Sequence, residues 1–101
     1  MSRRQPLSEE AITAFVSSHP GWSVSGDAPK ALSKHYAFTS YADGIAFVVR
    51  LGFAAEKRDH HPDLGVHWGK VHVDFSTHDA GGITALDLEM AELSDRLYRS
   101  E

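Results

Sequence analysis

Histidine is the residue type that stands out, because seven histidines and no cysteine occur among the 101 residues. Two are adjacent, in the segment 56–63 (EKRDHHPD), and a third follows in the segment 76–78 (STH). Imidazole has an ordinary pKa near neutrality, so clustered histidines suit either proton transfer or metal binding. A chain without cysteine forms no disulfide, thiol nucleophile or thiolate metal site. Either chemistry requires the fold to bring His60, His61 and His78 together.

The segments 64–68 and 71–77 are predicted to be strands joined tightly at Gly69-Lys70. Alternate side chains of a strand point to opposite faces of the sheet. One face of the second strand is therefore apolar and the other polar, with Val71, Val73 and Phe75 opposed to His72, Asp74 and Ser76. In an antiparallel hairpin the first strand starts beside the end of the second. We therefore expect the three histidines at one end of the sheet.

Several of these residues also have a purely structural interpretation. Adjacent histidines before a proline are equally compatible with a polar loop, and His67 and His72 are expected to be solvent-facing strand residues. Asp87 lies three residues after Thr84, so it is predicted in the first place to complete a helix-capping box.

Two other chemistries receive less support from the pattern. Three clustered histidines with a nearby carboxylate fit a metal site, but the chain has no H-E-x-x-H motif and no established ligand spacing. Nucleophilic catalysis would require Ser76 or Thr77 beside His78, and no nucleophile-elbow pattern surrounds them.

The remaining elements follow from caps and periodicity. A first helix is expected after Ser8, ending at Pro20-Gly21, and a hairpin from the segments 22–25 and 32–38 joined by residues 26–29. A second helix is predicted from Ser40 to about Lys57, and a third after Thr84. The order α-β-β-α-β-β-α predicts one α+β domain over 1–101, a four-stranded antiparallel sheet with three helices packed on one face.

The charged residues of the second helix, Asp43, Arg50 and Lys57, share one narrow stripe of its surface. That stripe is expected to face solvent. Another face is expected to meet the sheet, formed by Ile45, Val49, Gly52 and Glu56. Glu56 would then point under the sheet toward the histidine turn, the alternative being a bend into solvent at the helix end.

Composition excludes several classes of protein. Apolar residues make up 42% and charged residues 24%, which is ordinary for a globular domain. The longest apolar stretch is too short for a bilayer, and the start of the chain does not read as a signal peptide, so a cytoplasmic protein is expected. The net charge is −4 and the basic residues are scattered, which argues against direct binding of nucleic acid.

Taken together, these motifs are similar to those of a known enzyme family. Glu56-x-x-x-His60-His61-Pro62, followed by Lys70-Val71 and Ser76-Thr77-His78, resembles the signature of the pterin-4a-carbinolamine dehydratases. Gly82-Ile83-Thr84 and Asp87 extend the resemblance, which runs without a gap from about Ala54 to Asp87. Leu64 is a departure, because family members commonly carry a tryptophan there that helps to shape the pterin pocket.

The resemblance implies a hydro-lyase that dehydrates the 4a-hydroxytetrahydropterin released by an aromatic amino acid hydroxylase, without a cofactor or a metal. It implies that His60 and His78 are the acid/base pair and that His61 binds and orients the ring. Which of the two is the acid stays open. It further implies that Glu56 holds pterin N–H groups or positions a histidine and that Asp87 orients His78. Ser76 and Thr77 are the other expected substrate contacts.

A homodimer or homotetramer is expected, because one bare sheet face and exposed strand edges favour self-association. The alternative function is that of an interaction protein, since the family resemblance includes members that double as dimerisation partners of a transcription factor. Retention of all three histidines favours the enzyme.

Overall fold

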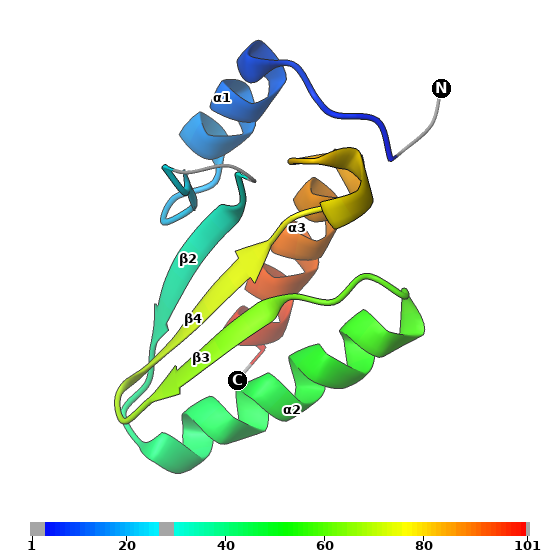
Figure 1. The fold of residues 1–101 in the computed structure, drawn as a ribbon. Helices are drawn as coiled ribbons and strands as arrows, with labels where there is room; N and C mark the ends of the chain where they lie inside the picture. Colours follow the sequence, from blue (N-terminus) through cyan, green and yellow to red (C-terminus); the bar gives the residue numbers. More distant parts are fainter. Residues whose placement is uncertain (1–3, 27–29, 101) are drawn as a thin grey trace.

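The computed structural model describes residues 4–26 and 30–100, and it contains the elements in the predicted order (Figure 1). They are α1 (Glu9–Ser18), β1 (Ser23–Val24), β2 (Leu32–Ala37), α2 (Tyr41–Lys57), β3 (Asp63–His67), β4 (Lys70–Phe75) and α3 (Ala85–Arg99). A short 3₁₀ turn, η1 (His78–Ala80), was not predicted. Positions 27–29 of the predicted first hairpin loop lie outside the described residues.

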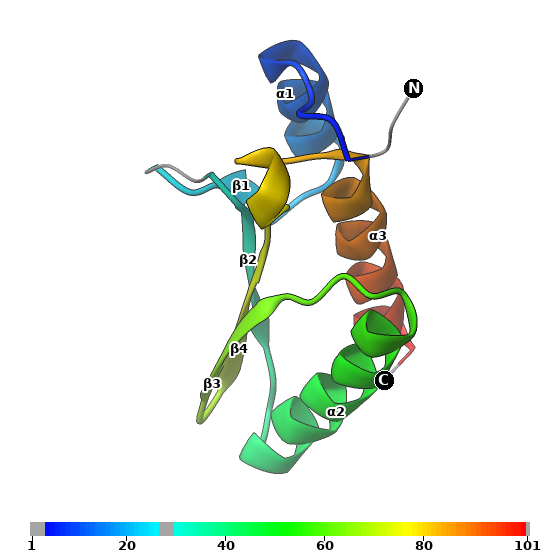
Figure 2. The same ribbon diagram turned by 45° about the vertical axis from the view of Figure 1, so that its right-hand side comes forward.

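The strands form one antiparallel sheet in the order β1-β2-β4-β3. In the β3–β4 hairpin, Asp63 lies opposite Asp74 and His67 opposite Lys70. The predicted hairpin is therefore confirmed, with its turn at Trp68-Gly69 rather than at Gly69-Lys70, because Lys70 already pairs within the sheet. Helices α2 and α3 cover one face of the sheet and leave the middle of the other face open (Figure 2). The α+β architecture predicted from the sequence is therefore confirmed.

The core lies between the sheet and the helices. The alternation predicted for β4 is confirmed, because Val71, Val73 and Phe75 are fully buried while His72 and Asp74 lie on the other face. The helices supply the other side of this core with side chains of both α2 and α3, namely Phe47, Leu51, Ala55, Met90 and Ala91.

The predicted inward face of α2 is wrong. Its buried residues are Gly44, Phe47, Leu51 and Ala55, whereas Ile45, Val49 and Glu56 are exposed and Gly52 is half-buried. The physical reason is that α2 carries two apolar stripes, and hydrophobicity alone does not choose between them. The second stripe consists of Tyr41, Ile45, Val49 and Phe53, which are 36–75% exposed. The predicted solvent face is confirmed for Asp43, Arg50 and Lys57.

A buried carboxylate joins α3 to the sheet. Asp95 accepts hydrogen bonds from Tyr36 Oη at 2.5 Å, Lys34 Nζ at 2.8 Å and Trp22 Nε1 at 3.0 Å. Burial alone would raise the pKa of Asp95, but these three donors stabilise the carboxylate and lower that pKa below its ordinary value. The stabilisation is therefore complete above the unfolded-state pKa of about 4 and is lost as pH falls through the lower folded-state value.

We expect Asp95→Ala to lower the free energy of unfolding by about 3 kcal/mol, because it leaves three donors without their acceptor. Urea denaturation at neutral pH measures this loss. Glu92→Ala is the control, because Glu92 lies on the same helix as Asp95 and pairs with His19 at a partly exposed site. Loss of that pair should cost under about 1 kcal/mol. Equal losses in the two variants would show that Asp95 is not a structural anchor.

Candidate active site

The end of α2 sets the position of His60. The backbone N–H of Asp59 donates to Glu56 O at 3.1 Å, and that of His60 donates to Ala55 O at 3.2 Å. Asp59 has a φ of 51°, the left-handed conformation that ends many helices. This Schellman pairing turns the chain sharply, and the side chain of His60 is buried, with 6% of the residue exposed.

The buried carboxylate of Asp87 fixes the position of the His60 ring. His60 Nε2 lies 2.6 Å from Asp87 Oδ1, and both side chains are buried. The second oxygen, Oδ2, accepts from the Thr84 backbone N–H at 2.8 Å and from Thr77 Oγ1 at 2.9 Å. Because a carboxylate only accepts hydrogen bonds, this geometry makes Nε2 the protonated nitrogen of His60. Nδ1 is then free to exchange a proton with a ligand.

The capping role predicted for Asp87 is confirmed, because Thr84 and Asp87 form a capping box at the start of α3. The partner predicted for Asp87 is wrong. Its carboxylate contacts His60 rather than His78, since His78 begins the 3₁₀ turn and is exposed. Thr77 is fully buried within the same network, where its hydroxyl pairs with Asp87 and Thr84, so that hydroxyl is an internal support rather than a free ligand contact.

The predicted orientation of Glu56 is also wrong. Its side chain is 77% exposed, because the buried face of α2 passes through Ala55 instead. Its carboxylate Oε1 nevertheless lies 2.7 Å from His61 Nε2, so Glu56 does contact a histidine. His61 itself is about half exposed, so this pair can orient the ring but lies largely in water.

An open pocket of about 410 Å³ brings the predicted histidines together. Its lining comes from the N-terminal segment, the α2–β3 turn and the segment after β4, and consists of Arg4, Asp59, His60, His61, Pro62, Asp63, Ser76, Thr77, His78 and Asp79. Five of the seven predicted site residues therefore line one pocket. Asp87 lies behind it and Glu56 lies outside it.

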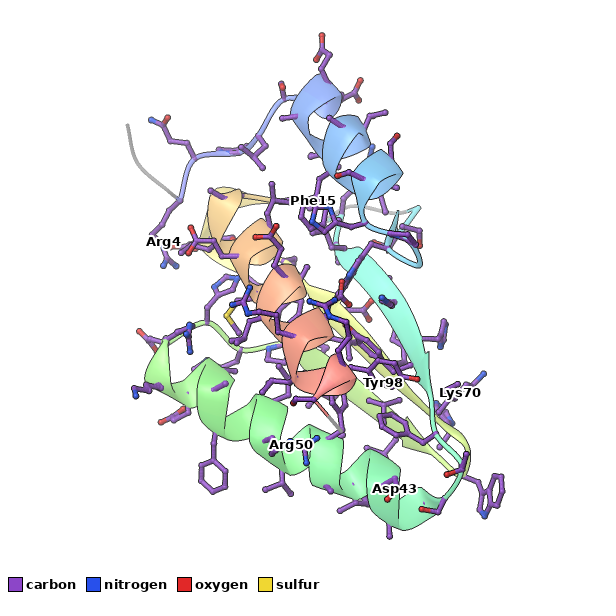
Figure 3. All side chains as sticks on the ribbon, turned by 180° about the vertical axis from the view of Figure 1, so that it is seen from behind. Arg4, Phe15, Asp43, Arg50, Lys70 and Tyr98 are labelled. Atoms are coloured by element: carbon purple, nitrogen blue, oxygen red, sulfur yellow. The ribbon has the colours of Figure 1, made fainter. Side chains whose placement is uncertain are left out.

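Sequence reasoning missed the contribution of Arg4 to this pocket. Arg4 Nη2 contacts both carboxylate oxygens of Asp79, at 3.1 and 3.2 Å, beside the turn that carries His78 (Figure 3). Hydrogen bonding to Arg4 lowers the pKa of the Asp79 carboxyl. Residue 4 belongs to no periodic element, so no local signal connects it with residue 79.

Leu64, the position where family members commonly carry a tryptophan, does not contribute to the wall of the pocket. Leu64 pairs with Val73 across the hairpin and packs against the core, and it is not part of the lining.

A larger hollow of about 510 Å³ lies between α1, β1 and residues 81–83, but it is lined by no histidine. Within the described ranges, no three His, Asp or Glu side chains are arranged to hold one metal ion. No described helix is long and apolar enough to cross a bilayer.

Comparison with known families agrees with this arrangement. Residues 5–97 match the family profile described as pterin 4 alpha carbinolamine dehydratase. The chain belongs to this family. Curated relatives carry the name of a hydro-lyase, so the class of activity that the resemblance implied is confirmed.

Curated relatives in the dehydratase family are similar over nearly their whole length. A protein of Mesorhizobium japonicum is 40% identical over 95 residues, which is 94% of this chain and 96% of the relative. A protein of Chromobacterium violaceum is 38% identical over 96 residues, covering 95% of this chain and 86% of that one. Both carry the provisional name pterin-4-alpha-carbinolamine dehydratase.

Solved structures share the dehydratase fold. A transcriptional coactivator/pterin dehydratase from Brucella melitensis superposes with a TM-score of 0.86 and 26% identity, covering 93% of this chain and 99% of that one. A pterin dehydratase-like protein, described as a RuBisCO assembly factor of the alpha-carboxysome, superposes with a TM-score of 0.66 and 27% identity over 79% of this chain and 92% of that one. The family fold therefore also carries proteins described by roles other than dehydration.

The His60–Asp87 contact predicts a defined tautomer. We expect ¹H–¹⁵N spectra to show His60 protonated at Nε2 in the native chain. In Asp87→Asn we expect the amide oxygen to keep the Thr77 and Thr84 bonds, so that its NH₂ group faces His60 and shifts the proton to Nδ1. Glu56→Gln is the matched control, because it contacts His61 alone. An Nδ1-protonated His60 in the native chain would contradict the assignment.

Proposed function

We propose that this chain dehydrates a 4a-hydroxytetrahydropterin to the quinonoid dihydropterin by histidine acid/base catalysis. The observation that carries the proposal is a buried histidine, His60, paired with a buried carboxylate behind a pocket whose rim holds two exposed histidines, His61 and His78. A pocket of about 410 Å³ is in the size range of small-molecule sites. Family membership supports the substrate class.

The reaction requires two proton transfers at neighbouring atoms. One proton is given to the 4a-hydroxyl, the C4a–O bond breaks, and water leaves. The N5–H proton is removed, and its electron pair forms the C4a=N5 double bond. No oxidant or reductant takes part. One group must therefore donate a proton and another must accept one, a task for which imidazole suits both positions.

The surroundings of the histidines suggest how the two roles divide. Asp87 stabilises the imidazolium that forms when Nδ1 of His60 accepts a proton, so we assign His60 as the base at N5. We assign the exposed His78 as the acid for the departing hydroxyl, because it exchanges protons with solvent directly. His61, oriented by Glu56, binds the ring, and Ser76 supplies a further polar contact.

The hydroxylase pathway and the cytoplasmic location stay predictions from the sequence. The alternative function, that of an interaction protein, gains support from one observation on this chain: the exposed apolar stripe of α2. That stripe is separate from the pocket lining, so an interaction role and a dehydratase role do not compete for the same residues.

Substitution of either assigned histidine tests the mechanism. With enzymatically generated 4a-hydroxytetrahydropterin, we expect His60→Ala and His78→Ala each to lower turnover by at least about 10-fold to 100-fold. His78→Ala should leave stability unchanged because that side chain is exposed. His60→Ala should also cost about 1–3 kcal/mol, since it leaves Asp87 Oδ1 unpaired.

His67→Ala is the matched control, because His67 is an exposed histidine on β3 outside the pocket. It should turn over substrate at the native rate. Native rates in both pocket variants would refute the acid/base assignment. Loss of activity on chelation, with recovery on adding one metal, would replace the proposed mechanism with a metal-dependent one.

We also propose that two copies of this chain pair through the α2 stripe formed by Tyr41, Ile45, Val49 and Phe53. Residues four apart form ridges that pack into the grooves of a second helix. The stripe is apolar at four successive positions, so the same stripe of a second copy, packed antiparallel, is complementary to it. This complementarity favours a second copy over an unrelated partner.

Light scattering coupled to size exclusion tests the pairing. We expect the native chain to be a dimer or a larger even oligomer, and Val49→Asp combined with Phe53→Asp to be a smaller species with unchanged circular dichroism. Trp68→Ser is the control, because Trp68 is 73% exposed but lies at the β3–β4 turn. A monomeric native chain, or a double variant of native size, would contradict the proposal.

A further inference from the structure

The open face of the sheet carries a second group of histidines, apart from the pocket. His35 of β2 lies directly opposite His72 of β4, and Gly65 of β3 lies opposite His72 on the other side. His67 of β3 leans toward the same place, since a Cβ on Gly65 would meet His67 Nε2 at 3.4 Å. Three neighbouring strands therefore bring imidazoles to one region of an uncovered sheet face.

The rings of His35 and His72 converge through their nitrogens. His72 Nδ1 lies 3.0 Å from His35 Nε2, and the ring centroids are 4.3 Å apart. On its other side, His72 Nε2 is 2.9 Å from both carboxylate oxygens of Asp74. Asp74 in turn accepts a hydrogen bond from Ser33. Nε2 of His72 is thus the protonated nitrogen, so Nδ1 of His72 accepts a hydrogen bond from the facing nitrogen of His35. A metal ion bound between the two rings would replace the proton of that hydrogen bond.

The contact between Asp74 and His72 is of the kind that orients metal-binding histidines. A ligating histidine ordinarily donates its other N–H to a carboxylate, which fixes the ring and its tautomer, as Asp74 does for His72.

The spacing of the two nitrogens indicates which ions would fit. Two nitrogens that each lie about 2.1 Å from a metal and 3.0 Å from one another subtend an angle of about 90°. That angle belongs to square-planar and octahedral ions such as Cu²⁺ and Ni²⁺, rather than to tetrahedral Zn²⁺. The exposed His35 ring can make the small turn that aims its nitrogen, because this torsion has a broad minimum.

We propose that His35 and His72 form a two-nitrogen site for a divalent transition-metal ion of the Cu²⁺ or Ni²⁺ class on the open sheet face. Asp74 orients His72, and water completes the coordination. The site does not depend on the proposed dehydratase function, because none of its residues lines the histidine pocket.

Titration with NiCl₂ tests the site on the full chain without a histidine tag, by calorimetry and by paramagnetic broadening of NMR signals. We expect one ion per chain, with broadening confined to residues near positions 35 and 72. His72→Gln should weaken binding at least tenfold, and so should His35→Gln. Asp74→Asn should weaken it by about 10-fold to 100-fold while both ligands remain.

The double variant His61→Gln with His78→Gln is the matched control, because it removes two exposed pocket histidines and leaves the sheet face intact. It should bind Ni²⁺ like the native chain. Binding lost in this control but kept in His72→Gln would overturn the proposal, and so would the absence of saturable binding in the native chain. Dehydratase assays on His72→Gln separate the two proposals, since turnover should be unchanged there.

Discussion

The contact between His60 and Asp87 joins three parts of the structure that are far apart in the sequence. Asp87 caps α3, receives Thr77 from the segment after β4, and holds His60 from the end of α2. A buried carboxylate is costly unless its acceptor positions are filled. Here both oxygens are used, so the position of the His60 ring and the start of α3 are stabilised by the same group. The pocket depends on that shared anchor more than on its exposed histidines.

Much of the fold was predictable because local signals agreed with the final packing. Ser8, Ser40 and Thr84 cap the helices as their residue types indicate, and the alternation in β4 identified its buried face correctly. The hairpin then brought His60, His61 and His78 to one end of the sheet by geometry alone. These predictions used patterns within one element or between two neighbours in sequence.

The errors have a different physical origin. The inward face of α2 depends on which of two apolar stripes meets β4, and that choice is made by packing across the sheet, as Gly44 against Val71 illustrates. The exposure of Glu56 follows from the same choice. The contact of Asp87 with His60 rather than His78 depends on how far the chain turns at Asp59. Long-range packing and left-handed backbone at a non-glycine residue leave little trace in sequence.

The turn that ends α2 also gives the pocket an intrinsic reporter. The amide of His60 donates to Ala55 O, so its proton exchanges with solvent only when the last turn of the helix opens. Each opening also releases His60 from the geometry that Asp87 holds. The protection of this one amide therefore measures the fraction of time for which the turn that positions His60 is formed. A folded chain can lose function through that local equilibrium while its global stability is unchanged.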